Sequence, residues 1–318
     1  MTILITGANG FVGRALCYRL AADHVPFRAA CRNVAQGDLP ASWETADGVL
    51  SAEHDWCAAL TSAAAVVHCA ARVHVMKEAA SDPLTAFRRV NVEGTLSLAR
   101  QAAAAGVRRF LFISSVKVNG ESTLPGHPFR ADSVPAPLDP YGVSKMEAER
   151  ALFSMARETG MEVVVIRPPL VYGPGVKANF LGLMRWLWQG VPLPLGAIHN
   201  ARSLVGIDNL VDLIVTCIDH SAAANQRFLV SDGEDLSTTK LLRRMGEALG
   251  KPARLIPVPA ALLQLGSKLL GRPDLARRLC ASLQLDVSQT RDLLGWNPPV
   301  SVDEGLRRTA AHWLAIKR

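Results

Sequence analysis

The chain has 318 residues, of which 49% are hydrophobic and 20% charged, and its formal net charge is +7. That is enough apolar sequence for one large domain or two joined lobes. The basic residues are scattered, without a stripe of lysine and arginine interleaved with aromatic residues, which argues against a nucleic-acid partner. No apolar run approaches the roughly 18 residues of a membrane-spanning helix, so we expect no membrane association.

The six cysteines form no C-x-x-C pair and no cysteine–histidine spacing typical of zinc sites, so we predict no metal site. Free cysteines pack as small hydrophobic residues and favour a reducing compartment. The sequence passes from Met1 directly into a predicted strand, without the basic region or cleavage site of a secretory signal. We therefore expect a cytoplasmic protein.

The first predicted element is a short apolar strand over 2–6, followed by a glycine-rich turn over 7–13 and a helical pattern. In this context the first glycine permits the tight turn, the second lets the backbone approach a pyrophosphate, and the third lets helix pack on strand. The N–H groups at the start of the helix are donors for phosphate. The turn therefore predicts cofactor contacts at Gly7, Gly10, Phe11, Val12 and Gly13.

The second predicted strand, over 25–31, is followed by Arg32. NAD-preferring sites usually place Asp or Glu here, to accept from the ribose 2′-OH. A guanidinium can instead pair with a 2′-phosphate. Arg32 therefore favours NADP(H), with NAD(H) as the alternative; an exposed arginine at a strand end is the other interpretation.

A third strand is predicted around 43–50 and a fourth over 65–68, ending on His68. Small residues follow, Ala70 among them, which let a ligand lie close. A lone histidine in a strand is typical of a core residue with satisfied hydrogen bonds.

A long helix is predicted from Pro83, and its buried stripe contains Asn91. A buried amide without partners costs about 1–3 kcal/mol. We expect Asn91 to serve a backbone break or a proton-relay water behind a site, with a merely structural role as the alternative.

The fifth predicted strand, over 110–113, delivers Ser114 and Ser115 at its carboxyl end, where ligands bind in open parallel sheets. Further along, Asp139 and Pro140 read as the cap and first residue of a helix. Tyr141 and Lys145 then share one face of that helix.

An ammonium beside a phenol favours the phenolate and lowers the pKa of tyrosine from about 10. The spacing of Tyr141 and Lys145 therefore predicts an acid/base group. Ser115, the glycine turn and this helix can converge on one crevice.

Seven different motifs follow one another along the chain: T-G-A-N-G-F-V-G at 6–13, V-V-H-C-A-A at 66–71, V-N-V-E-G-T at 90–95, F-I-S-S-V-K-V-N-G at 112–120, Y-G-V-S-K at 141–145, R-P-P-L-V-Y-G-P-G at 167–175 and R-S-L-V-G-I-D-N-L-V-D at 202–212. In these segments the chain resembles the extended short-chain dehydrogenase/reductase family, and within it the nucleotide-sugar epimerases, dehydratases and reductases. The resemblance covers nearly the whole chain.

The resemblance implies that Tyr141 is the proton donor and acceptor at the sugar C4 oxygen, and that Ser115 shares this oxygen. It implies that Lys145 holds the nicotinamide ribose and lowers the pKa of Tyr141. Its expected cofactor contacts, besides the glycine turn and Arg32, are Ala70, Asn91, Tyr141, Lys145 and Pro168.

The resemblance also implies contacts to a UDP-sugar, since Asn179 and Arg202 match positions that touch the nucleotide diphosphate. The full set of expected substrate contacts is Ser115, Lys117, Asn179, Arg202 and Arg278. Family dehydratases carry Asp-Glu directly after the catalytic Ser/Thr, where this chain has Val116 and Lys117, which argues against a dehydratase.

The predicted fold is α/β, with a Rossmann-type doubly wound parallel sheet over 1–168, to which 203–225 returns. A smaller, interwoven and discontinuous substrate-binding lobe is predicted over 169–318. A homodimer is expected, because two helices commonly form a dimer interface in the resembling family.

The leading functional interpretation is a reductase that delivers hydride to a UDP-4-keto-6-deoxy-N-acetylhexosamine, in surface-polysaccharide synthesis. The alternative is a UDP-hexose or UDP-N-acetylhexosamine 4-epimerase. A non-catalytic dinucleotide-binding protein is the third interpretation, and the intact Ser115, Tyr141 and Lys145 argue against it.

Overall fold

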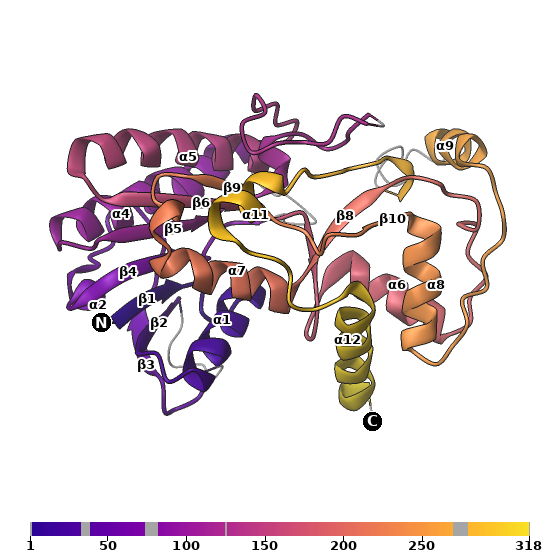
Figure 1. Ribbon diagram of the computed structural model, residues 1–318, viewed down its shortest axis with the longest axis horizontal. Coiled ribbons are helices and arrows are strands. Elements are labelled where there is room, and N and C mark those ends of the chain that lie inside the picture. The colour runs from indigo at the N-terminus through magenta and orange to yellow at the C-terminus, as the bar shows by residue number, and fades with distance from the viewer. Residues whose placement is uncertain (1, 33–38, 74–81, 125, 270–278, 318) are drawn as a thin grey trace.

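The computed structural model describes residues 2–32, 39–73, 82–124, 126–269 and 279–317. Its main feature is a seven-stranded sheet in the order β3-β2-β1-β4-β5-β6-β9, with every pairing parallel. Helices cover both faces of the sheet (Figure 1). The predicted Rossmann-type α/β fold is therefore confirmed. The strands of this sheet are β1 (Thr2–Thr6), β2 (Phe27–Cys31), β3 (Glu44–Asp47), β4 (Ala63–His68), β5 (Arg109–Ile113), β6 (Glu162–Arg167) and β9 (Arg227–Leu229).

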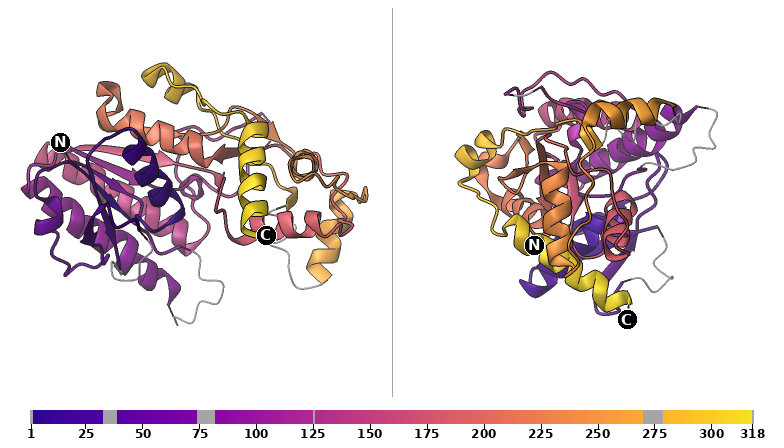
Figure 2. Two further views of the ribbon diagram at one scale, coloured as in Figure 1. Left: turned by 90° about the horizontal axis from the view of Figure 1, so that it is seen from below. Right: turned by 90° about the vertical axis from the view of Figure 1, so that its right-hand side faces the viewer.

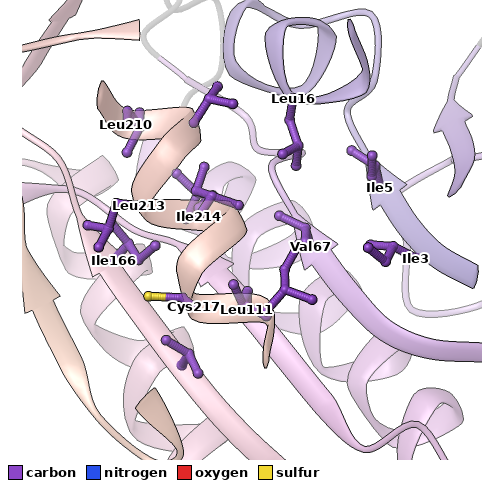
Figure 3. Close-up of a cluster of buried hydrophobic side chains, with 14 of the residues drawn as sticks. Ile3, Ile5, Leu16, Val67, Leu111, Ile166, Leu210, Leu213, Ile214 and Cys217 are labelled. Carbon is purple, nitrogen blue, oxygen red and sulfur yellow. The ribbon is translucent and has the colours of Figure 1, made fainter. Parts of the chain in front are cut away.

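The central strands are mostly apolar because both of their faces are buried, and their charged residues lie at their ends. On one face, α1 (Phe11–Ala22) and α7 (Ile207–Asp219) pack on side chains such as Val67, Leu111 and Ile166 (Figure 3). The opposite face packs against α2 (Cys57–Leu60), α4 (Thr95–Ala104) and α5 (Pro140–Thr159). The site thus stands on a sheet fixed from both sides.

The helix predicted from Pro83 is divided into three parts. It runs as α3 (Pro83–Arg88), a π-helical turn η2 (Arg89–Gly94) and α4. Asn91 lies in the π-helical turn, as expected for a residue at a backbone break. The predicted third strand is shorter than expected, since β3 covers only four residues.

The second lobe lies beside the sheet along the long axis of the molecule (Figures 1 and 2). It has its own three-stranded sheet, in the order β10-β8-β7, and its own buried core. Short 3-10 turns, η3 (Val116–Val118) and η4 (Ser221–Ala223), occur in the first lobe. The remaining elements are β7 (Leu170–Tyr172), α6 (Ala178–Trp188), β8 (Arg202–Gly206), β10 (Asp235–Leu236), α8 (Thr238–Ala248), α9 (Ala260–Leu269), α11 (Ser288–Leu294) and α12 (Val302–Lys317).

The chain returns to the first lobe after it has entered the second. Beyond residue 225, β9 pairs with β6 at the edge of the large sheet. Still later, Leu294 and Trp296 enter the core that α7 shares.

Among the described residues, no helix is both long and apolar enough to cross a membrane.

Candidate functional site

Two glycines of the turn, Gly7 and Gly13, lie where there is no room for a side chain. Gly7 has φ +67°, and a Cβ there would lie 2.8 Å from the backbone N of Ala70. A Cβ on Gly13 would lie 2.3 Å from the Gly7 carbonyl oxygen. The turn therefore presses against the end of β4, and only glycine permits that approach.

The start of α1 is suited to a dinucleotide pyrophosphate. Gly10 is the N-cap of the helix, and no side chain caps it. The first N–H groups of a helix lack partners within the helix and carry the positive end of its dipole. The turn and helix start thus have the shape and charge that a pyrophosphate needs.

Arg32 is exposed and directly follows β2, next to β3 in the sheet. The carboxyl edge of a parallel sheet is where such folds bind an adenosine ribose, and contact with Arg32 there stays a prediction. The Asp or Glu that NAD-preferring sites usually place at this point is absent, since the strand ends on Cys31 and Arg32 follows.

The ends of β5 and β6 are joined beside Ser115. Val116 N donates to the Pro168 carbonyl at 3.0 Å, and Lys117 N donates to Ser115 Oγ at 3.2 Å. Ser115 and Pro168, predicted from separate motifs, therefore lie on adjoining loops at one edge of the sheet.

Tyr141 and Lys145 lie in the first turns of α5, which begins as predicted. Asp139 caps the helix by accepting from Gly142 N at 2.7 Å. Lys145 is 2% exposed, and its Nζ donates to the Ile113 carbonyl at 2.8 Å. The Lys145 ammonium also lies 4.2 Å from the centroid of the Phe112 ring. Lys145 is thus fixed against the end of β5.

The ionisation of this pair differs from the prediction. Burial lowers the pKa of Lys145 to about 7. Burial, followed by the Asp139 carboxylate, raises the pKa of the half-buried Tyr141 above its ordinary value. This direction is opposite to the lowering expected from Lys145, because desolvation disfavours the charged phenolate.

Asn91 connects two elements of the site. Its amide nitrogen donates to the Arg72 carbonyl and to Ser144 Oγ, each at 3.0 Å, and its oxygen accepts from Arg72 N at 2.8 Å. Ser144 Oγ in turn donates to the Tyr141 carbonyl at 2.8 Å. Asn91 thereby holds the chain after β4 against the start of α5.

The expected substrate residues are not all brought together. Lys117 forms an ion pair with Asp139, and Glu121 lies 3.6 Å from its Nζ. Asn179 is exposed near the start of α6. Arg202 in β8 donates to the Ala281 carbonyl at 2.9 Å, and burial lowers the pKa of its guanidinium. Arg278 lies outside the described residues.

A buried ion pair beneath the site was not foreseen from the sequence. Arg167 donates to both carboxylate oxygens of Glu149, at 2.9 and 2.5 Å, and each side chain is 2% exposed. Ser114 Oγ donates to Glu149 at 2.5 Å, and Asn119 accepts from Arg167 at 3.1 Å. A charged residue within the apolar strand over 162–167 was the available signal.

His68 is a core residue, as its isolation in the sequence suggested. One ring nitrogen lies 2.6 Å from Thr6 Oγ1 and the other 3.0 Å from Thr95 Oγ1. Burial, with a smaller contribution from Lys145, lowers the pKa of His68 to about 3. His68 is neutral at physiological pH.

Comparisons with known proteins agree with this arrangement. The NAD dependent epimerase/dehydratase family matches residues 3–231. A protein of Vibrio cholerae named UDP-glucose 4-epimerase is 50% identical over 316 residues, which cover 98% of this chain and 95% of that protein.

Solved structures share the fold at lower identity. The UDP-glucose 4-epimerase of Thermotoga maritima, solved with UDP-glucose, superposes with a TM-score of 0.80 at 22% identity over 100% of both chains. RMD from Pseudomonas aeruginosa, complexed with NADPH, superposes with a TM-score of 0.75 at 22% identity, covering 98% of this chain and 99% of that one.

The family match covers residues 3–231, which is most of the chain, and the 50% identical relative covers nearly all of it. The chain therefore belongs to the NAD dependent epimerase/dehydratase family and is an enzyme of the nucleotide-sugar epimerase and reductase group of extended short-chain dehydrogenases/reductases.

Proposed function

We propose that the protein is a UDP-hexose 4-epimerase, acting on UDP-glucose or its N-acetylated counterpart. The observation that carries the proposal is the convergence of Ser115, Tyr141 and Lys145 at the carboxyl edge of the sheet, beside the glycine turn. Inversion at C4 needs one proton-transfer group at one oxygen and a cofactor next to it. The 50% identical relative named UDP-glucose 4-epimerase supports the epimerase over the reductase that leads the sequence analysis.

Tyr141 is the group that would remove and return the proton of the C4 hydroxyl, and the Ser115 hydroxyl would orient the same oxygen. Lys145 would hold the ribose next to the reacting carbon. A bound nicotinamide dinucleotide would supply the hydride acceptor and donor. Gly7, Gly10 and Gly13 would let its pyrophosphate approach the start of α1, where no side chain caps the helix.

The residues after Ser115 support a reaction without elimination. Val116 is 5% exposed, and Lys117 is paired with Asp139. Neither side chain offers a carboxylate for removing a proton from C5. This supports proton transfer at C4 alone.

The test is to incubate the purified protein with UDP-glucose, and separately with UDP-N-acetylglucosamine, without added cofactor. We expect conversion to the galacto sugar in at least one case, measured by anion-exchange chromatography. A protein that leaves both sugars unchanged, yet oxidises NADPH with a UDP-4-keto-6-deoxy sugar, would overturn the proposal.

One observation favours that reductase as the second candidate. Arg32 follows β2 where an acidic residue would favour NAD, and it is exposed for a 2′-phosphate. A reductase exchanges its cofactor at each turnover and can use NADPH, whereas an epimerase recycles a tightly held NAD. The mass of any nucleotide that co-purifies distinguishes the two.

A further inference from the structure

We propose that Lys117 and Asp139 form a positioning pair, which fixes the Tyr141 end of α5 against the Ser115 loop and balances the charge beside the phenol. This assigns to Lys117 a role different from the substrate contact expected from the sequence. The inference rests on the proposed function only in taking Tyr141 as the proton-transfer group.

The Asp139 carboxylate joins the two elements that carry the site. One of its oxygens accepts from Gly142 N at 2.7 Å and so caps α5. The other accepts from Lys117 Nζ, which belongs to the turn η3 directly after Ser115. The Asp139 side chain therefore links the loop that carries Ser115 to the start of the helix that carries Tyr141.

Backbone contacts show that the loop and the helix lie against each other. A Cβ on Gly142 would lie 2.9 Å from the Lys117 carbonyl oxygen and 3.0 Å from Pro137 Cβ. Ala136 N also donates to the Val118 carbonyl at 3.0 Å. The ion pair thus bridges an interface that is already closely packed.

The pair is only partly accessible to water, since the Lys117 and Asp139 side chains are 29% and 16% exposed. At such exposure an ion pair is less screened than one at the surface. Its charges therefore act on a neighbouring phenol more strongly than surface charges do.

The Asp139 carboxylate contributes to the raised pKa of Tyr141, after burial. The positive charge of Lys117, placed on that carboxylate, opposes this effect. Charged groups on the described elements around this end of α5 include Asp139, Lys117, Glu121, Lys145, Arg72 and Arg88, together with Arg89 and Glu93 of η2. Glu121 lies near Lys117, Arg72 lies over the Phe87 ring, and Arg88 is paired with Glu147. Of these charged groups, Asp139 contributes most to the raised pKa of Tyr141.

The pair can be tested without measuring turnover. The chain has three tyrosines, so labelling with 3,5-difluorotyrosine gives few ¹⁹F resonances, and the intrinsically more acidic fluorinated phenol titrates at lower pH. Tyr141→Phe identifies the Tyr141 resonance by its loss. The midpoint of this resonance is then followed in each variant.

We expect opposite shifts from the two single variants. In Lys117→Met the midpoint should move to higher pH, because the Asp139 charge is no longer balanced. In Asp139→Asn, which retains a capping oxygen, it should move to lower pH. The double variant Lys117→Met/Asp139→Asn should lie between them, and Lys117→Arg should stay near the wild-type value.

The kinetic test uses the same variants. The pH profile of kcat should move with the NMR midpoint, and Lys117→Met should lower kcat about tenfold at neutral pH while KM changes less. Lys268→Met, an exposed lysine on α9, is the matched control and should leave both readouts unchanged.

Identical Tyr141 midpoints in wild type, Lys117→Met and Asp139→Asn would overturn the inference, as would a double variant that behaves like Lys117→Met. An active Tyr141→Phe variant would instead refute the assignment of Tyr141 in the proposed function, while the titrations would still report on the pair.

Discussion

The Lys145 ammonium is buried and donates a hydrogen bond to the backbone at the end of β5. Burial lowers its pKa to about 7, so that its charge changes within the physiological pH range. Its bond to the Ile113 carbonyl requires a donor, which both the ammonium and the neutral amine provide. The position of Lys145 is thus maintained across this range, while its charge is not.

Removing the Tyr141 hydroxyl should abolish proton transfer without disturbing α5. We expect Tyr141→Phe to lower kcat roughly 10²-fold or more. Cofactor affinity should change little, because the ring and its contact with Phe87 remain. Steady-state kinetics and fluorescence titration with NADH measure the two effects.

Tyr18→Phe is the control, since this tyrosine is 53% exposed on α1. Equal losses in both variants would point to a general effect of removing a phenol and would refute the assignment.

Replacing Arg32 tests which dinucleotide the site prefers. If its guanidinium pairs with a 2′-phosphate, Arg32→Ala should weaken NADPH binding about tenfold or more and NADH binding much less. Calorimetric titration with each nucleotide gives the two dissociation constants. Arg157→Ala, an exposed arginine near the end of α5, should change neither. A uniform loss for both nucleotides would show that Arg32 does not read the phosphate.

At the scale of elements, the start of α5 shows what local sequence specifies. Asp139 and Pro140 predict a capped helix start, and the structure has one there. The strand–turn–helix of the glycine turn is also local, and it was predictable for the same reason. Both depend on residues within one or two helical turns.

The form of the break at Asn91 and the partners of the buried ion pair were not predicted, for two physical reasons. One extra residue in a helical turn hardly changes a hydrophobic pattern, so η2 was absorbed into one long predicted helix. Glu149 and Arg167 meet only because α5 packs beside β6. The pKa of Tyr141 likewise depends on burial, which the spacing of two residues does not reveal.

The packing of η3 on α5 gives a prediction for Gly142→Ala. The added methyl group would lie 2.9 Å from the Lys117 carbonyl oxygen, so the loop must shift away from the helix. We expect a loss of about 1–3 kcal/mol in the free energy of unfolding, measured by urea denaturation, together with reduced kcat.

Gly182→Ala in α6 is a matched control, because nothing lies within 4 Å of the Cβ that it adds. It should be neutral or stabilising, since alanine favours helix. A Gly142→Ala variant as stable as Gly182→Ala would show that the two elements are less closely packed than described.

For the whole molecule, His68 predicts how stability depends on pH. The unfolded chain binds a proton at this residue below its ordinary pKa of 6.5, whereas the folded protein does so only near pH 3. Stability should therefore fall as pH decreases between these values, by about 1.4 kcal/mol per pH unit.

We expect His68→Gln, which can still bond both Thr6 and Thr95, to make this decline shallower by about that slope. Urea denaturation at several pH values from neutral to about 4 measures it. His127→Gln, at an exposed histidine, should leave the slope as in wild type. A slope unchanged in His68→Gln would show that other groups govern acid stability.

The last strand of the large sheet, β9, comes from chain that has already passed through the second lobe. A fragment ending at residue 168 would therefore lack both β9 and α7. β6 would become an open edge strand, able to pair with other chains, and the apolar face that α7 covers would be exposed to water. The half of this molecule that holds the large sheet is thus built from two separate segments of chain, so transplanting it into another protein would require both segments.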